Sequence, residues 1–135
     1  MKRILFLMIL MIGFCNLTKA DTIDYCHVHY NHVLRWDFGI YKGDYKITID
    51  KATLHYNDSI QIYYYTDAPC NACKSAILVQ YENMQAFISK KNNCYSIALK
   101  DLFNLGGNNI KEIPIFYQVS TNTKNAFQIF MLVIH

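Results

Sequence analysis

Apolar and polar residues alternate with a period of two along much of this chain of 135 residues. Successive side chains of a β-strand point to opposite faces of a sheet, so the alternation predicts strands that bury one face. A continuous apolar run instead predicts a strand buried on both faces. The predicted strands, of which the last is the continuous run, cover 34–40, 45–49, 52–56, 60–66, 95–100, 113–119 and 127–134.

Turn residues between these strands predict how some of them pair. Lys42-Gly43-Asp44 lies between 34–40 and 45–49, which predicts that these two strands form a hairpin. A polar turn separates 113–119 from 127–134 and predicts a second hairpin. Short strands with frequent turns are typical of an antiparallel sandwich or a small barrel, and the order resembles an immunoglobulin-type sandwich in architecture. We therefore expect an all-β fold, a small antiparallel immunoglobulin-like β-sandwich.

The pattern leaves one segment ambiguous and places a proline within a predicted strand. The segment 74–90 has apolar residues at both helical and strand spacing, so its secondary structure is left open. Pro114 has no N–H to donate to a neighbouring strand, so we expect it at the start of a strand or at a sheet edge.

The first twenty residues predict an export signal. Two basic residues, Lys2-Arg3, precede the apolar run 4–14, and the small or polar residues Thr18-Lys19-Ala20 follow. This layout is typical of a secretory signal peptide that is cleaved after the last small residue. Lipid attachment at Cys15 is disfavoured, because a bulky phenylalanine precedes that cysteine. We expect a secreted or periplasmic protein.

The mature chain is then a single domain over 21–135 with no formal net charge. Without Lys2, Arg3 and Lys19, the 13 basic residues of the whole chain become ten, which equals the number of acidic residues. A neutral chain lacks the basic surface that nucleic-acid binding requires, so nucleic acid is excluded as the expected partner. No second apolar span follows the signal, so no transmembrane helix is expected in the mature chain.

Four cysteines remain in the mature chain: Cys26, Cys70, Cys73 and Cys94. An even number of cysteines in a small exported domain favours disulfides that stabilise the fold. Four cysteines allow three pairings, and the sequence does not choose among them.

The Cys70-Asn-Ala-Cys73 motif also supports a second interpretation. It follows the apolar strand 60–66, and Ile113-Pro114 precedes another apolar strand further along the chain. This context resembles the thioredoxin family in part. The resemblance implies an α/β fold and thiol-disulfide exchange, with Cys70 as the nucleophile, Cys73 as the resolving thiol and Pro114 as the substrate-docking proline. A strand-rich pattern at both ends of the mature chain departs from that family, so structural disulfides are our first interpretation.

Three histidines lie close together in the sequence near Cys26. His27 and His29 alternate, so they point to the same face if this segment is a strand, and His32 follows after a short spacing. Imidazoles in such a group could bind zinc or copper. The simpler interpretation is a polar strand with exposed imidazoles, so we expect neither a metal nor another cofactor.

The predicted strand 60–66 contains three consecutive tyrosines. Tyr63 and Tyr65 fall on the face opposite Ile60, Ile62 and Tyr64, so we expect them to be the more exposed set. Exposed aromatic rings with polar tips are favoured at binding surfaces.

These features favour an exported, non-enzymatic binding module that is stabilised by disulfides and recognises another protein or an extracellular ligand. No sequence motif of a common hydrolase, kinase or nucleotide-binding protein accompanies them. The alternative is a thiol-disulfide oxidoreductase that uses Cys70 and Cys73.

Overall fold

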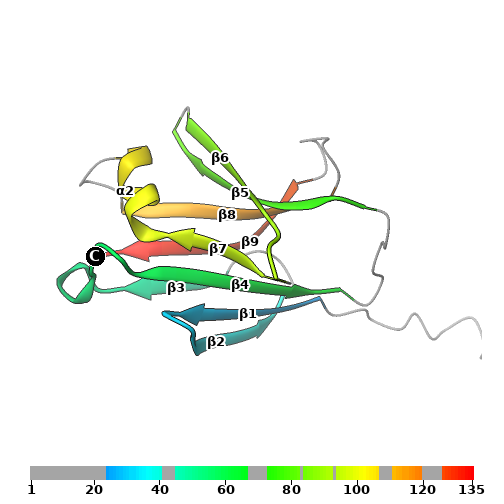
Figure 1. Ribbon diagram of the computed structural model, residues 1–135, viewed down its shortest axis with the longest axis horizontal. Coiled ribbons are helices and arrows are strands. Elements are labelled where there is room, and N and C mark those ends of the chain that lie inside the picture. Colours follow the sequence, from blue (N-terminus) through cyan, green and yellow to red (C-terminus); the bar gives the residue numbers. More distant parts are fainter. Residues whose placement is uncertain are drawn as a thin grey trace, which may run out of the picture.

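The computed structural model describes residues 24–40, 45–66, 73–82, 84–92, 94–106, 111–119 and 126–135. The predicted signal peptide over 1–20, Cys15 and Cys70 lie outside these ranges. Within them, nine strands form two sheets, so the all-β prediction is confirmed (Figure 1). None of the helical residues described belongs to a helix long and apolar enough to cross a membrane.

Sheet A contains four antiparallel strands in the order β2-β1-β4-β7. Their bounds are Tyr25–Tyr30 (β1), Val33–Gly39 (β2), Ser59–Tyr65 (β4) and Tyr95–Ala98 (β7). The β1–β2 hairpin closes at Asn31 and His32, whose φ angles are 49° and 68°. Two successive residues with positive φ are characteristic of a type I′ turn, whose twist matches that of the strands it joins.

Sheet B contains five strands in the order β3-β9-β8-β5-β6. Strands β3 and β9 are parallel, and the other neighbours are antiparallel. The bounds are Lys46–Ile49 (β3), Ser75–Tyr81 (β5), Met84–Ser89 (β6), Glu112–Val119 (β8) and Ala126–Ile134 (β9). A 3₁₀ turn, η1 (Lys51–Thr53), follows β3, and a short helix, α2 (Leu99–Gly106), follows β7 (Figure 1).

The core lies between the two sheets and contains the apolar half of each alternating strand. Val28 and Ile62 of sheet A are fully buried, as are Ile115, Phe130 and Leu132 of sheet B. Full burial of such a side chain contributes roughly 1.5–3 kcal/mol. Because side chains alternate along each strand, fixing this inner set also fixes which residues lie on the outer faces.

The hairpin predicted between 34–40 and 45–49 is wrong. Strand β2 pairs with β1 in sheet A, whereas β3 lies in sheet B, parallel to β9. The tight turn at Asn31 and His32 pairs β2 with β1, which precedes it in the chain. The sequence pattern had not identified β1 as an apolar strand. The expected antiparallel arrangement therefore fails at the β3–β9 pair.

Two predicted strands are shorter or absent. Residues 52–56 do not form a strand, because the chain turns through η1, where the Asp50 carboxylate accepts a 2.8 Å hydrogen bond from Ala52 N–H. The strand predicted over 95–100 ends at Ala98, and α2 begins at the fully buried Leu99.

The remaining strand predictions agree with the structure. The open segment 74–90 folds as the antiparallel hairpin β5–β6, which closes between Tyr81 and Met84. The hairpin predicted at 113–119 and 127–134 is confirmed as β8–β9. Pro114 lies near the start of β8, before the residues that pair with β5, as its missing N–H requires.

The α/β alternative for the fold is wrong. In the ranges that the structure describes, secondary structure consists of two packed sheets and short helical segments, without alternating strands and helices. A thioredoxin-like fold needs helices that cover the sheet, and these strands instead bury their apolar faces against a second sheet.

Asp58 ties the β1–β2 turn to the start of β4. Its buried carboxylate accepts hydrogen bonds from the Tyr30 hydroxyl, from the Asn31 side-chain amide at 2.7 Å and from His55 N–H at 2.7 Å. Burial alone would raise the pKa of Asp58, but these donors and the nearby His55 imidazole lower it below the ordinary value. The charged carboxylate therefore stabilises the folded state.

Candidate binding face

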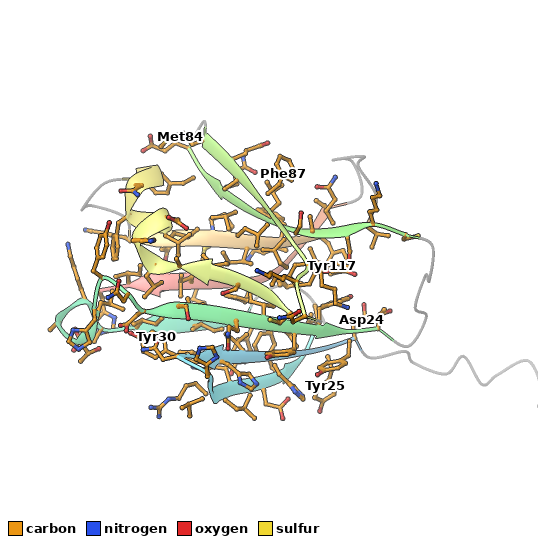
Figure 2. All side chains as sticks on the ribbon, in the orientation of Figure 1. Asp24, Tyr25, Tyr30, Met84, Phe87 and Tyr117 are labelled. Carbon is orange, nitrogen blue, oxygen red and sulfur yellow. The ribbon has the colours of Figure 1, made fainter. Side chains whose placement is uncertain are left out.

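The outer face of sheet A brings together two features that the sequence had shown separately. Strand β1 presents Tyr25, His27 and His29, and the neighbouring strand β4 presents Tyr63 and Tyr65. The register places Tyr25 opposite Tyr65 and His27 opposite Tyr63. We call these five residues the tyrosine-histidine face. In Figure 2, Tyr25 projects from β1 away from sheet B, whereas Tyr117 lies between the sheets.

The rings of this face contact one another diagonally across the two strands. The ring centroids of His27 and Tyr65 are 5.2 Å apart, and those of His29 and Tyr63 are 4.8 Å apart. Tyr25 packs edge-on against His27 at 6.1 Å. Cross-strand aromatic pairs of this kind each contribute roughly 0.2–1 kcal/mol, and they hold the rings in a fixed arrangement.

Each of the two histidines has one polar neighbour, and the nearby His32 has another. His27 Nε2 lies 3.3 Å from the Asp37 carboxylate of β2, and His29 Nδ1 lies 3.4 Å from the carbonyl oxygen of His32. The Gln61 amide donates a 2.9 Å hydrogen bond to His32 Nδ1. The imidazoles are therefore oriented by neighbours on β2, β4 and the turn, and their rings remain at the surface.

The exposure of Tyr65 follows the alternation of β4, whereas Tyr63 and Tyr64 are both partly buried. Tyr65 is 51% exposed and Tyr25 is 45% exposed, whereas Ile60 and Ile62 are buried. Tyr63 is partly exposed on the outer side, and it is held beside Cys94. The pKa of Tyr63 is raised, first by the charge interaction with Cys94 and then by burial, so its phenol stays protonated and can donate a hydrogen bond.

The three histidines proposed as weak metal ligands do not gather into one site. His27 and His29 lie on the outer face, and His32 turns its Nδ1 to Gln61. Within the described ranges no group of three or more histidine, cysteine, aspartate or glutamate side chains is arranged to hold a metal ion.

Two of the four predicted disulfide cysteines are free, which corrects that prediction for Cys26 and Cys94. Both are buried, but strand β4 lies between β1 and β7, at two strand spacings of about 10 Å in total, too far for a disulfide. Burial, and then the Asp37 carboxylate, raise the pKa of Cys26 to about 12, so this thiol is protonated at neutral pH. Cys94 donates a weak 3.4 Å hydrogen bond to the carbonyl oxygen of Lys91.

Two residues of the alternative thioredoxin-like site, Cys73 and Pro114, are not brought together. Cys70 lies outside the described residues, and Cys73 is exposed just before β5. The register of β5 and β8 places Val119 opposite Ser75 and leaves Pro114 beyond the other end of the pairing. At about 3.4 Å per residue, Pro114 is therefore more than about 15 Å from the end of β5 where Cys73 lies.

Sequence reasoning missed Tyr25 and Asp37 as members or partners of this face. Tyr25 alternates with His27 and His29 and could have been found by extending that spacing by one step. Asp37 could not, because its contact with His27 depends on the β1–β2 pairing that the turn prediction placed elsewhere.

Comparisons of this chain with protein-family models, with curated proteins and with solved structures found no match.

Proposed function

We propose that this protein is an exported, non-enzymatic binding module that recognises another protein through the tyrosine-histidine face. The layout of the first twenty residues supports export. The single observation that carries the binding role is the ordered array of rings on the outer face of sheet A, where Tyr25 and Tyr65 are about half exposed.

Such an array suits protein recognition for a physical reason. A tyrosine ring offers a large contact area and a polar hydroxyl, and it loses little conformational freedom on binding. Here the rings already pack on His27 and His29, so part of that freedom is lost before any partner arrives. Pre-ordered aromatic side chains are the usual anchors of protein interfaces.

We also propose that the sandwich is immunoglobulin-like. In that fold, strands B and E are neighbours in one sheet, and strands C, F and G form the other. The neighbours β4 and β7 of sheet A correspond in order to B and E, and β5, β8 and β9 of sheet B correspond to C, F and G. Strand β6, beside β5, then has the place of the C′ strand in variable-type domains. An experimentally determined structure of the protein, superposed on known sandwiches, tests this assignment.

The binding role is tested by photo-crosslinking in cells that produce the protein. A photoreactive phenylalanine analogue replaces Tyr65 in one variant and Tyr56 in another. Tyr56 is a matched control, because it is 70% exposed but precedes β4 at the end far from Tyr65. We expect a discrete protein adduct from position 65 and none of that mass from position 56.

A second substitution tests whether the adduct depends on the rest of the tyrosine-histidine face. Tyr25→Ser in the position-65 variant should reduce the adduct yield several-fold, because Tyr25 lies opposite residue 65 on β1. Equal adducts from positions 56 and 65, or an adduct that is insensitive to Tyr25→Ser, would contradict the proposal.

The thiol-disulfide alternative is not proposed in its place. It requires a proline beside the cysteine pair, and Pro114 and Cys73 lie toward opposite ends of the β5–β8 pairing.

A further inference from the structure

A pocket of about 280 Å³ lies at one side of the sandwich, where an outer strand of each sheet comes to the surface. Among the described strands, β2 lies at one edge of sheet A and β3 lies at one edge of sheet B. Residues from both strands, and from the turn after β3, surround the pocket: Tyr30, Arg35, Trp36, Thr48, Ile49, Asp50 and Thr53. The tyrosine-histidine face is not part of it.

A β-bulge brings two consecutive residues to this pocket. In the β1–β2 register, Val28 pairs with Trp36 but His29 pairs with Leu34, so Arg35 is an extra residue on β2. Regular alternation would point Arg35 and Trp36 to opposite faces of the sheet. A bulge changes the direction of one side chain, and here both Arg35 and Trp36 line the same pocket.

The pocket contains a cation and an anion that are not paired with each other. Arg35 and Asp50 both line it, and the part of the chain that the structure describes gives Arg35 no ion pair. One oxygen of the Asp50 carboxylate accepts the hydrogen bond from Ala52 N–H that caps η1, which leaves the other oxygen for a ligand. The guanidinium comes from sheet A and the carboxylate follows β3 of sheet B, so the two charges belong to different walls.

The wall between these charges is mainly apolar. Trp36 and Ile49 contribute an indole ring and a branched aliphatic side chain. The Tyr30 hydroxyl already donates a hydrogen bond to Asp58, so this residue contributes its ring to the pocket rather than a free donor. Small-ligand sites commonly combine such an apolar lining with a few placed polar groups, at volumes from about 300 Å³ upward.

We propose that this pocket binds a small zwitterion, namely a free α-amino acid with a large apolar side chain. The Arg35 guanidinium binds the ligand carboxylate, whose planar geometry it matches with two parallel N–H donors. The Asp50 carboxylate binds the α-ammonium group, and the apolar side chain packs against Trp36 and Ile49. The volume of about 280 Å³ is enough for a ligand the size of one amino acid. This inference goes beyond the proposed protein-binding role and does not depend on it.

Trp36 makes the inference directly measurable, because it is the single tryptophan of the chain. Tryptophan fluorescence of the purified protein is followed during titration with L-phenylalanine, which does not fluoresce in the same range. We expect a saturable change. L-phenylalaninamide, which lacks the carboxylate, and N-acetyl-L-phenylalanine, which lacks the ammonium group, should each bind roughly tenfold or more weakly, as expected for the loss of one charge-assisted contact.

Matched variants assign the two charges. Arg35→Gln should weaken L-phenylalanine binding roughly tenfold and abolish the preference for L-phenylalanine over its amide. Asp50→Asn retains a residue that caps a helical turn well, and it should abolish the preference for the free over the acetylated amine. Lys90→Gln removes an exposed cation outside the pocket lining and should leave all affinities unchanged.

Three results would overturn the proposal. The first is the absence of a saturable change with L-phenylalanine in the unmodified protein. The second is an equal response to all three ligands, which would indicate apolar contact alone. The third is equal weakening by Arg35→Gln and Lys90→Gln, which would indicate a general effect of charge. The ligand series uses the unmodified protein, so it remains decisive even if a variant does not fold.

Discussion

Sheet A carries tyrosines on both faces, and the inner and outer sets differ in what surrounds them. On the inner face, the hydroxyl groups of three tyrosines are hydrogen-bonded: Tyr30 to Asp58, Tyr64 to Asp24 and Tyr95 to Ser75. The ring of Tyr64 also stacks on Tyr117 of sheet B, with centroids 3.9 Å apart. Burial is the largest cause that raises the pKa of each inner tyrosine, to about 12 for Tyr95 and further for the other two.

The outer tyrosines pack against imidazoles, whereas the inner ones are hydrogen-bonded to carboxylates or to a serine hydroxyl. The ring of Tyr65 packs against His27 and that of Tyr63 against His29, and both tyrosine rings remain accessible to solvent. Along β4, Tyr64 packs against the core, Tyr63 on the other face is partly buried, and Tyr65 is exposed. One residue type therefore packs against the core on one face of the strand and remains accessible on the other.

The largest expected difference in stability is between truncating an inner tyrosine and truncating an outer one. Tyr64→Ala removes a ring packed between the sheets and should lower the free energy of unfolding by about 3–5 kcal/mol. Tyr65→Ala, at the next position, should lower it by less than about 1 kcal/mol, because its ring is half exposed. Urea unfolding followed by circular dichroism measures both values. Similar losses for the two variants would mean that the inner and outer sets do not differ in this way.

The carboxylate that holds an inner tyrosine should matter more than one that faces outward. Asp58→Ala leaves the Tyr30 hydroxyl and two other donors without their acceptor, and should cost about 2–4 kcal/mol. Asp37→Ala is the control, because its pair with His27 is exposed and should contribute at most about 1 kcal/mol. The same unfolding experiment applies, and an Asp37→Ala loss as large as that of Asp58→Ala would contradict the assignment.

Asp58 should also make stability depend on acid pH. Its pKa is lowered in the folded state, so its contribution is present above the ordinary aspartate value of about 3.9 and is lost as pH falls through the lower folded value. Unfolding free energies measured from neutral pH down to strongly acid pH should therefore fall more steeply for the unmodified protein than for Asp58→Asn. Parallel curves for the two proteins would show that Asp58 does not titrate in this way.

The smallest expected effect appears at alkaline pH. The pKa values of Tyr30, Tyr64 and Tyr95 are raised, so these residues stabilise the fold below the ordinary tyrosine value of about 10 and lose that contribution as pH rises toward 12 and above. Ultraviolet titration of the folded protein should show a group of phenols that ionise only above about pH 11. In denaturant, all eleven tyrosines should ionise together near the ordinary value.

The alternation of residues was enough to predict most strands, because burial of one face is a local property of a strand. Ile60, Ile62 and Tyr64 were correctly assigned to one side of β4, and Tyr65 to the other. Pairing between strands is not local. The Asn31-His32 turn closes β1–β2 although neither residue is glycine, so the turn signal at Lys42-Gly43-Asp44 was given more weight than it should have had.

The tyrosine-histidine face could also be predicted only in part, because it depends on strand pairing. Alternation identified His27 with His29, and Tyr63 with Tyr65, as two separate pairs of side chains. Only the pairing of β1 with β4 places them side by side. The number of cysteines suggested disulfides, but Cys26 alternates with the core residue Val28 and is used as a small buried side chain.

The parallel pairing of β3 with β9 has a consequence for how the protein reaches its folded state. Lys46 pairs with Met131, so their positions differ by 85, and β9 lies between β3 and β8 inside sheet B. Closing so large a loop costs entropy before any contact is gained, and such long-range pairings fold slowly. Sheet B cannot be completed during synthesis until residue 134 has been added. Until then, β3 and β8 lack the strand that lies between them, so the two-sheet core forms only after the last strand has been synthesised.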